Sequence, residues 1–338
     1  MIDKKRTFLK SLVATAAVVA TCALQAADKS HSYILATATT GGTFYPVGVA
    51  IATLTKLKLA PKYNISLSAI SSAGSGENVK LLRKNQAQFA ILQGLYGAWA
   101  FHGEGRVASP QRHLRSVTML WPNVEHFVVK SDVVKTGTVA DLKHFDKAKF
   151  SIGKRNSGTE GSGRHILSAL GINVDNTFKV VYLGYNPSTN ALQNGNIKGM
   201  NIPAGVPVSA VTRAFAVLGK RITVLDFTDE QRQQVNSTYP LWTPYVIPAN
   251  TYPNQNKAIK TIAQPNFLAV REDVAEEDVY LITKSIYENL PFLRVIHKAL
   301  NAMALEKAID GLPMPLHPGA ARYYREVGID IPDYLIAK

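Results

Sequence analysis

The chain has 338 residues and a formal net charge of +14, with 46% hydrophobic and 18% charged residues. This composition excludes an intrinsically disordered chain, and the length suffices for two domains that each bury a core. A basic surface favours anionic solutes. The N-terminal residues predict export from the cytoplasm, which argues against nucleic acid as a partner.

Residues 1–26 predict a secretory signal peptide. Lys4, Lys5 and Arg6 precede an uncharged stretch that ends in small residues near position 26. This stretch is shorter than the roughly 20 apolar residues of a membrane span, so the protein is not expected to span a membrane itself. A membrane anchor and a lipoprotein attached at Cys22 are the alternatives. Cleavage after residue 26 removes the single cysteine and leaves a periplasmic protein without disulfides or cysteine-based metal sites.

Predicted strands alternate with predicted helices in the next hundred residues. Strand-like runs at 33–37, 65–70 and 89–93 are each followed by a stretch with helical patterning. Repeated β–α units predict a mostly parallel sheet covered by helices. In such sheets ligands collect at the carboxyl ends of the strands, where the intervening loops lie.

A second series of strands and helices begins after residue 130. Residues 266–271 then repeat the pattern of residues 125–130 and precede a strong helical pattern. The simplest α/β arrangement is two lobes, each a mostly parallel sheet flanked by helices, with two crossing segments and a ligand cleft between the lobes. The expected boundaries are 27–130 plus 262–338 for lobe I and 131–261 for lobe II.

Three loops rich in Gly, Ser and Thr each stand between a predicted strand and a predicted helix, at residues 39–46, 71–78 and 156–160. Such a loop leaves unpaired backbone N–H groups at the start of the helix, where the helix dipole also attracts negative charge. Three such helix starts around one cleft predict a receptor for a small carboxylate.

The third loop contains the sequence of a capping box. Ser157 is expected to cap the helix while Glu160 reaches back to its N–H. Ser157 and Thr159 are also expected to contact the ligand, because Gly158 exposes the backbone between them. Glu160 is either a helix cap or a ligand contact.

The first two loops supply further candidate contacts. Gly42 lets the backbone approach a ligand, Thr43 offers a hydroxyl, and Tyr45 is expected to line the pocket wall. In the second loop, Ser75 is a candidate N-cap and Asn78 can both donate and accept hydrogen bonds. Plain strand-to-helix turns are the alternative for both loops.

Four other residues have two open interpretations. Gln93, at the end of a predicted strand, either contacts the ligand or bonds neighbouring backbone. Trp121 either covers the cleft or belongs to the core. Arg155 and Arg164 add positive charge near the third loop, and whether they touch the ligand stays open.

Enzyme signatures are absent from the sequence. It contains no G-x-S-x-G, no G-x-x-x-x-G-K-[ST], no G-x-G-x-x-G and no H-E-x-x-H, and the eight histidines are scattered. Ser162 and His165 stand three residues apart on one predicted helix and are expected to be surface neighbours, not a nucleophile and its base. We therefore expect no catalytic residue, no metal and no cofactor.

These loops resemble those of the TAXI-type solute receptors of tripartite (TRAP) transporters, and the resemblance covers nearly all of the chain after the signal. It implies a two-lobed periplasmic-binding-protein fold of the type II kind, a membrane permease driven by an ion gradient, and a small carboxylate ligand such as a glutamate-like amino acid or a dicarboxylate. The stretches that match are Thr40–Pro46, Gly74–Asn78 with Leu81 and Leu82, Ala90–Gln93, Ser157–Glu160, and Pro315–Ala320 with Tyr323 and Tyr324.

The chain departs from that family at three places. Trp121 stands where a Tyr is usual, residues 202–205 replace a more apolar segment, and Lys154 with Arg155 is more basic than expected. The departures bear on ligand identity. Two other classes stay open, a ligand sensor for a membrane kinase and a periplasmic enzyme on the same scaffold. Closure is expected as a hinge motion near Lys130 and Thr261.

Overall fold

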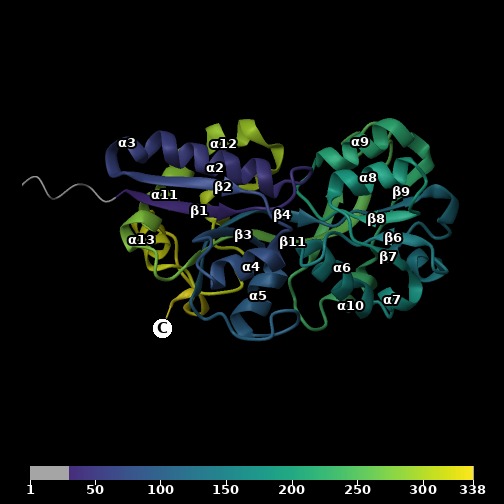
Figure 1. Cartoon of the computed structure of the whole chain (residues 1–338), viewed down its shortest axis with the longest axis horizontal. Coiled ribbons are helices and arrows are strands. Elements are labelled where there is room, and N and C mark those ends of the chain that lie inside the picture. Colours follow the sequence, from purple (N-terminus) through teal and green to yellow (C-terminus); the bar gives the residue numbers. More distant parts are fainter. Residues whose placement is uncertain (1–29, 338) are drawn as a thin grey trace, which may run out of the picture.

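The computed structural model describes residues 30–337, which form two β-sheets flanked by helices (Figure 1). The predicted signal peptide lies outside the described residues. Within the described residues, no helix combines the length and the apolar character needed to cross a membrane.

The first sheet has the strand order β10-β11-β3-β1-β2, with β4 also paired to β11. β1 pairs in parallel with both β2 and β3, as the β–α repeats predict. β11 runs antiparallel to β3, β4 and β10. The strand bounds are β1 His31–Ala36, β2 Ile65–Ile70, β3 Phe89–Gln93, β4 Leu114–Val124, β10 Thr243–Ile247 and β11 Ile259–Arg271.

The second sheet has the order β7-β6-β8-β5-β9. β6 is parallel to β7 and β8, and β5 is antiparallel to β8 and β9. The strand bounds are β5 Phe127–Lys130, β6 Lys149–Ser151, β7 Lys179–Val181, β8 Gly199–Asn201 and β9 Ile222–Val224.

Both sheets are mixed, which corrects the expectation of mostly parallel sheets. The cause is the way the chain passes between the sheets. β4 is an edge of the first sheet, and after two residues the chain enters the second sheet as β5, antiparallel to its neighbours. β11 then returns to the first sheet. It pairs antiparallel with β4 along the whole length of β4, and antiparallel with β3 on its other side. The α/β class is confirmed.

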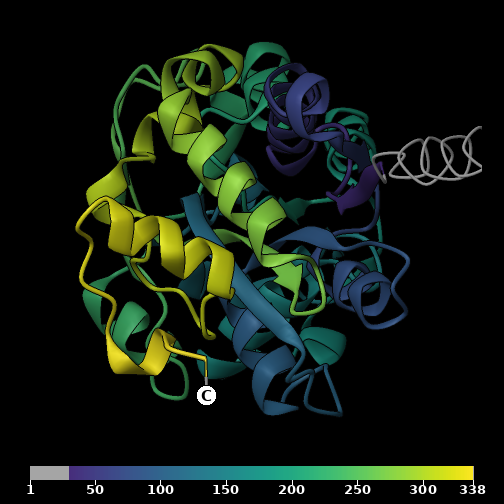
Figure 2. The same ribbon diagram turned by 90° about the vertical axis from the view of Figure 1, so that its left-hand side faces the viewer.

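Helices cover both sheets. We call the first sheet with α2–α5 and α11–α13 the first lobe, and the second sheet with α6–α10 the second lobe (Figure 1). Near the C-terminus α11 packs against α13 (Figure 2). The helix bounds are α2 Phe44–Lys58, α3 Ala60–Tyr63, α4 Ser75–Arg83, α5 Gly94–His102, α6 Gly158–Ala169, α7 Val174–Thr177, α8 Tyr185–Gln193, α9 Ser209–Leu218, α10 Asp229–Val235, α11 Glu276–Glu288, α12 Leu290–Ile296 and α13 Pro318–Glu326.

Buried apolar side chains support both sheets. β3 is buried along its whole length, and α4 and α5 pack against it. Phe127, Phe150 and Phe178 form an aromatic group under the second sheet. The segment between β4 and β5 is equally buried, with Glu125 and His126 both fully buried. This polar segment lies where the chain passes from one lobe to the other.

Candidate functional site

Four helix starts meet at a cavity of about 30 Å³ between the two lobes. α2 and α4 come from the first lobe, α6 and α8 from the second. Each start follows a strand, so the loops between strand and helix form the cavity wall, as expected for the carboxyl ends of strands in α/β sheets. The cavity is lined by Ala38, Thr39, Gly42, Thr43, Phe44, Ala73, Gly74, Ser75, Gln93, Lys154, Ser157, Gly158, Thr159, Gly184, Tyr185 and Pro203.

Seven of the ten predicted site residues line this cavity: Gly42, Thr43, Ser75, Gln93, Ser157, Gly158 and Thr159. The three predicted loops therefore converge in space although they are far apart in the sequence. Tyr45, Asn78 and Glu160 do not line it. Tyr45 lies one residue further around α2 than Phe44, which faces the cavity.

The start of α6 has most of the predicted capping box. The Ser157 hydroxyl accepts a hydrogen bond from the Glu160 N–H at 3.0 Å. The Glu160 carboxylate accepts from the N–H of Asn156 at 2.8 Å, one residue before the predicted donor. Asn156 has a positive φ of 61°, which turns its N–H toward that carboxylate. The Glu160 N–H of the first turn thus has a local acceptor, and the dipole of this twelve-residue helix points at the cavity.

The start of α4 differs from the prediction. Gly74, with φ of 118°, is the N-cap, and Ser75 is the first helical residue. The Ser75 hydroxyl instead accepts from the N–H of Gln93 at 3.1 Å. Asn78 donates to the carbonyls of Thr37 and Ile91 at 2.8 and 2.9 Å. Asn78 therefore ties the ends of β1 and β3 together, since its amide is used by backbone of the first lobe.

Thr43, at the start of α2, contacts the second lobe. The N–H of Gly205 donates to the Thr43 hydroxyl at 3.1 Å, and that hydroxyl lies 3.3 Å from the Gly205 carbonyl. The Ser209 hydroxyl donates to the carbonyl of Gly41 at 3.1 Å. The first loop thus joins the two lobes beside the cavity.

The fourth helix start was not predicted from the sequence. Gly184 is the N-cap of α8, and Tyr185 is its first residue. The Tyr185 hydroxyl lies 2.9 Å from the Thr159 hydroxyl and donates to the carbonyl of Pro203 at 2.5 Å. Burial raises the pKa of Tyr185 well above its usual value, so the hydroxyl keeps its proton. A strand followed by Gly and a Pro in the first helical turn, here Pro187, was the available signal.

Lys154 gives the cavity a positive charge. It is exposed, lines the cavity, and also lines an adjoining groove of about 450 Å³ that opens beside Thr39 and Tyr185. Among the described residues that line the cavity, none is acidic and Lys154 is the one cation. The groove is lined by the carboxylate of Glu77 as well as by this ammonium group, whereas the described lining of the cavity has the ammonium group alone. The lining therefore suits a small anion.

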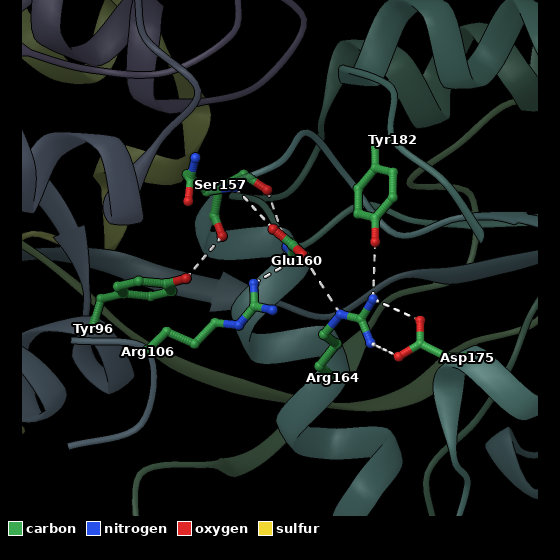
Figure 3. A network of polar contacts seen from close by, with 8 residues as sticks. Tyr96, Arg106, Ser157, Glu160, Arg164, Asp175 and Tyr182 are labelled. Atoms are coloured by element: carbon green, nitrogen blue, oxygen red, sulfur yellow. Dashed lines mark hydrogen bonds and ion pairs between the residues drawn. The ribbon is translucent and has the colours of Figure 1, made fainter. Parts of the chain in front are cut away.

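Glu160 belongs to an ionic network beside the cavity (Figure 3). Its carboxylate is 2.8 Å from Arg106, which lies in the loop after α5, and 3.5 Å from Arg164. Arg164 forms a second ion pair with Asp175 at 2.9 Å. Arg155 lies over the ring of Tyr182, 3.8 Å from its centroid. Neither Arg155 nor Arg164 lines the cavity, and the Arg106–Glu160 pair connects the two lobes.

Trp121 is fully buried and packs edge-on against Phe44, with ring centroids 5.7 Å apart. The expectation that Ser162 and His165 are surface neighbours is wrong, because Ser162 is fully buried and His165 stacks on Trp242. In residues 30–337 no three His, Cys, Asp or Glu side chains are grouped so as to hold a metal ion.

The comparisons with known proteins agree with this architecture. A family profile described as "NMT1-like family" matches residues 35–328. MatC from Rhodopseudomonas palustris, solved with bound malate, is 12% identical with a TM-score of 0.57, over 88% of this chain and 99% of MatC. XAC2383 from Xanthomonas citri, solved bound to ATP, is 10% identical with a TM-score of 0.50, over 88% of this chain and 96% of that protein. The chain has the two-lobed fold of periplasmic solute-binding proteins.

Proposed function

The chain belongs to the NMT1-like family, and we propose that it is a periplasmic receptor for a small carboxylate. The observation that carries this proposal is the convergence of four helix starts and Lys154 on one cavity between the lobes. Helix N-termini and an ammonium group favour negative charge, and the lining residues provide no carboxylate that would repel it. Binding without chemical conversion is the proposed role.

The positions of the lining residues support a set of contacts for the proposed carboxylate. Its oxygens would lie in the cavity, beside the adjoining α4 and α6 starts at Ser75 and Gly158, with Lys154 on the groove side. Thr43 and Thr159 add hydroxyl groups on the remaining sides. Closure of the lobes near Lys130 and Thr261 would exclude water from the ligand.

We further propose that the receptor serves a TRAP permease of the TAXI type. The ordered set of loop motifs from Thr40 to Tyr324 supports this assignment. On the same grounds we propose that the ligand belongs to the class of glutamate-like amino acids and dicarboxylates. MatC, whose solved structure contains malate, shows that a protein of this fold can hold a dicarboxylate.

Isothermal titration of the mature protein against a panel of carboxylates, amino acids and neutral sugars tests the proposal. We expect at least one carboxylate to bind and to lose about tenfold in affinity in the variant Lys154→Met, because the charge facing the ligand is removed. The matched control is Lys149→Met, which changes an exposed lysine on β6. Binding of neutral sugars alone, or equal affinity in both variants, would contradict the proposal.

A further inference from the structure

Polar side chains gather on one face of the first sheet, at the end nearest the second lobe. The strand register aligns Gln93, Asn266 and Trp121 in one row across β3, β11 and β4, and Gln264 with Asn123 in the next row. Successive side chains on a strand alternate between faces, so both rows share a face. All five residues are at most 2% exposed. We call this group the polar floor.

The polar floor has many hydrogen-bonding atoms without protein partners. Both amide atoms of Asn123 and of Asn266 lack a partner, as do Gln93 Oε1, Gln264 Nε2 and Trp121 Nε1. Buried polar atoms in native proteins are nearly always paired, because an unpaired buried donor or acceptor is costly. A concentration of such atoms on one sheet face therefore indicates that something outside the chain pairs with them.

This face is directed toward the cavity. Gln93 itself lines the cavity, and its Oε1 lies 2.7 Å from the position that a Cβ at Gly158 would occupy. Trp121 contacts Phe44, which also lines the cavity, and its Nε1 lies 2.9 Å from the equivalent position at Gly205. The first row of the floor thus begins at the cavity, at Gln93, and continues beside it through Asn266 to Trp121.

We propose that the polar floor is a second subsite that binds an uncharged hydrogen-bonding group of the ligand. The floor offers donors and acceptors but no Lys, Arg or His, so a second carboxylate placed there would be desolvated without a counter-charge. A carboxamide or hydroxyl, in contrast, can form hydrogen bonds with the amide and indole groups without the desolvation of a charge. This inference rests on the proposed carboxylate receptor, and within it favours ligands with one carboxylate and a neutral polar end over dicarboxylates.

A matched series of four-carbon ligands tests the inference. Succinamate carries one carboxylate and a carboxamide, succinate carries two carboxylates, and butyrate carries one carboxylate and no second polar group. By calorimetry we expect succinamate to bind at least about tenfold more tightly than either of the other two. Butyrate leaves the polar atoms of the floor without partners, and succinate places a carboxylate there without a counter-charge. Equal binding of succinamate and butyrate, or tighter binding of succinate, would overturn the inference and leave the proposed function standing. Failure of every carboxylate in the wider panel would instead overturn the proposed function.

The variant Asn266→Leu separates a ligand contact from a structural role. Leucine has a similar volume and removes two unpaired polar atoms, so the thermal midpoint of the ligand-free protein should rise, while the preference for succinamate over butyrate should be lost. Trp121→Phe removes one donor and keeps the ring against Phe44, and it should reduce the same preference by a smaller factor. Asn196→Leu, at an exposed position of the second lobe, is the control for an Asn-to-Leu change. A lower midpoint with an unchanged preference would assign Asn266 a structural role and refute the subsite.

Discussion

The starts of α4 and α6 have the same local design but different surroundings. In each, a glutamate of the first turn accepts a hydrogen bond from a backbone N–H four residues earlier: Glu77 from Ala73 at 2.6 Å, and Glu160 from Asn156 at 2.8 Å. The two starts face each other across the cavity, where the Glu77 N–H donates to the Asn156 carbonyl at 2.9 Å. Local capping alone therefore does not distinguish them.

The ionic environments of Glu77 and Glu160 distinguish the two helix starts. Glu160 is 4% exposed and is paired with Arg106 of the first lobe, whereas Glu77 is half-buried at the groove and has no ion pair within 4 Å among the described residues. A cap that also pairs across the lobes can hold the closed form, and a cap that does not can only hold its own helix. A first-turn glutamate that caps its helix therefore also joins the lobes only where the tertiary structure places a cation of the other lobe beside it.

The largest expected effect on ligand binding comes from the contact between the two starts. A Cβ at Gly76 would lie 2.4 Å from the Asn156 carbonyl oxygen, a backbone atom of the opposite lobe. Gly76→Ala should therefore block closure and weaken ligand binding by about a hundredfold, by reducing the population of the binding-competent state. Because alanine favours the helix itself, the thermal midpoint without ligand should not fall.

Small-angle scattering gives the second readout for this variant. The wild-type protein should contract when ligand is added, and Gly76→Ala should not. Lys80→Ala, at an exposed position on the same helix, is the control and should contract normally. A Gly76→Ala protein that closes as the wild type does would show that the two helix starts do not meet in the closed form.

The buried carboxyl group of Glu125, beside α6, should make the stability of the protein depend on pH. Glu125 faces Ser162 of α6, Asn201 and Trp242, and burial raises its pKa to about 8 from the usual 4.5. The folded protein then holds this proton after the unfolded chain has lost it, so stability falls as pH rises from about 4.5 to about 8. Glu125→Gln stays neutral and should be more stable than the wild type by about 4 kcal/mol at the upper end of this interval, and equal to it below about pH 4.5.

Denaturant unfolding across pH checks this expectation. His126 provides an internal control, because burial lowers its pKa to about 4, so both proteins should lose stability as pH falls from 6.5 toward 4. A wild type and a Glu125→Gln variant with parallel curves up to pH 8 would show that Glu125 is ionised in the folded protein at neutral pH.

The smallest effect distinguishes the two caps directly. Arg106→Ala removes the inter-lobe partner of Glu160 and should speed ligand release by about tenfold, with little change in the association rate. Arg106 is partly exposed, so the effect should shrink at high salt. Glu77→Gln is the matched comparison and should change the release rate by less than about threefold, because Gln can still accept the Ala73 N–H. Stopped-flow kinetics measures both, and equal effects would remove the distinction between the two starts.

A helix start could be predicted from the sequence when the residues that form its cap are close together in the chain. The Ser157 cap spans three residues, so its partner is written in the same loop. Asn78 was misjudged because its partners are carbonyls of β1 and β3, which strand pairing brings together. Ser75 was misassigned as an N-cap because Gly74 takes that place and Gln93, eighteen residues later, uses its hydroxyl. The start of α8 carried a readable signal that the prediction passed over.

What the sequence by itself determined is the set of small-residue turns that begin α2, α4 and α6, since turn geometry and capping depend on neighbours within about four residues. Only the tertiary structure decided that these starts share one cavity with α8 and Lys154, that Glu160 pairs with Arg106, and that five polar side chains form a floor. The physical reason is range: strand register and lobe packing join residues that are tens to hundreds of positions apart, and no local pattern in the chain specifies which of them will meet.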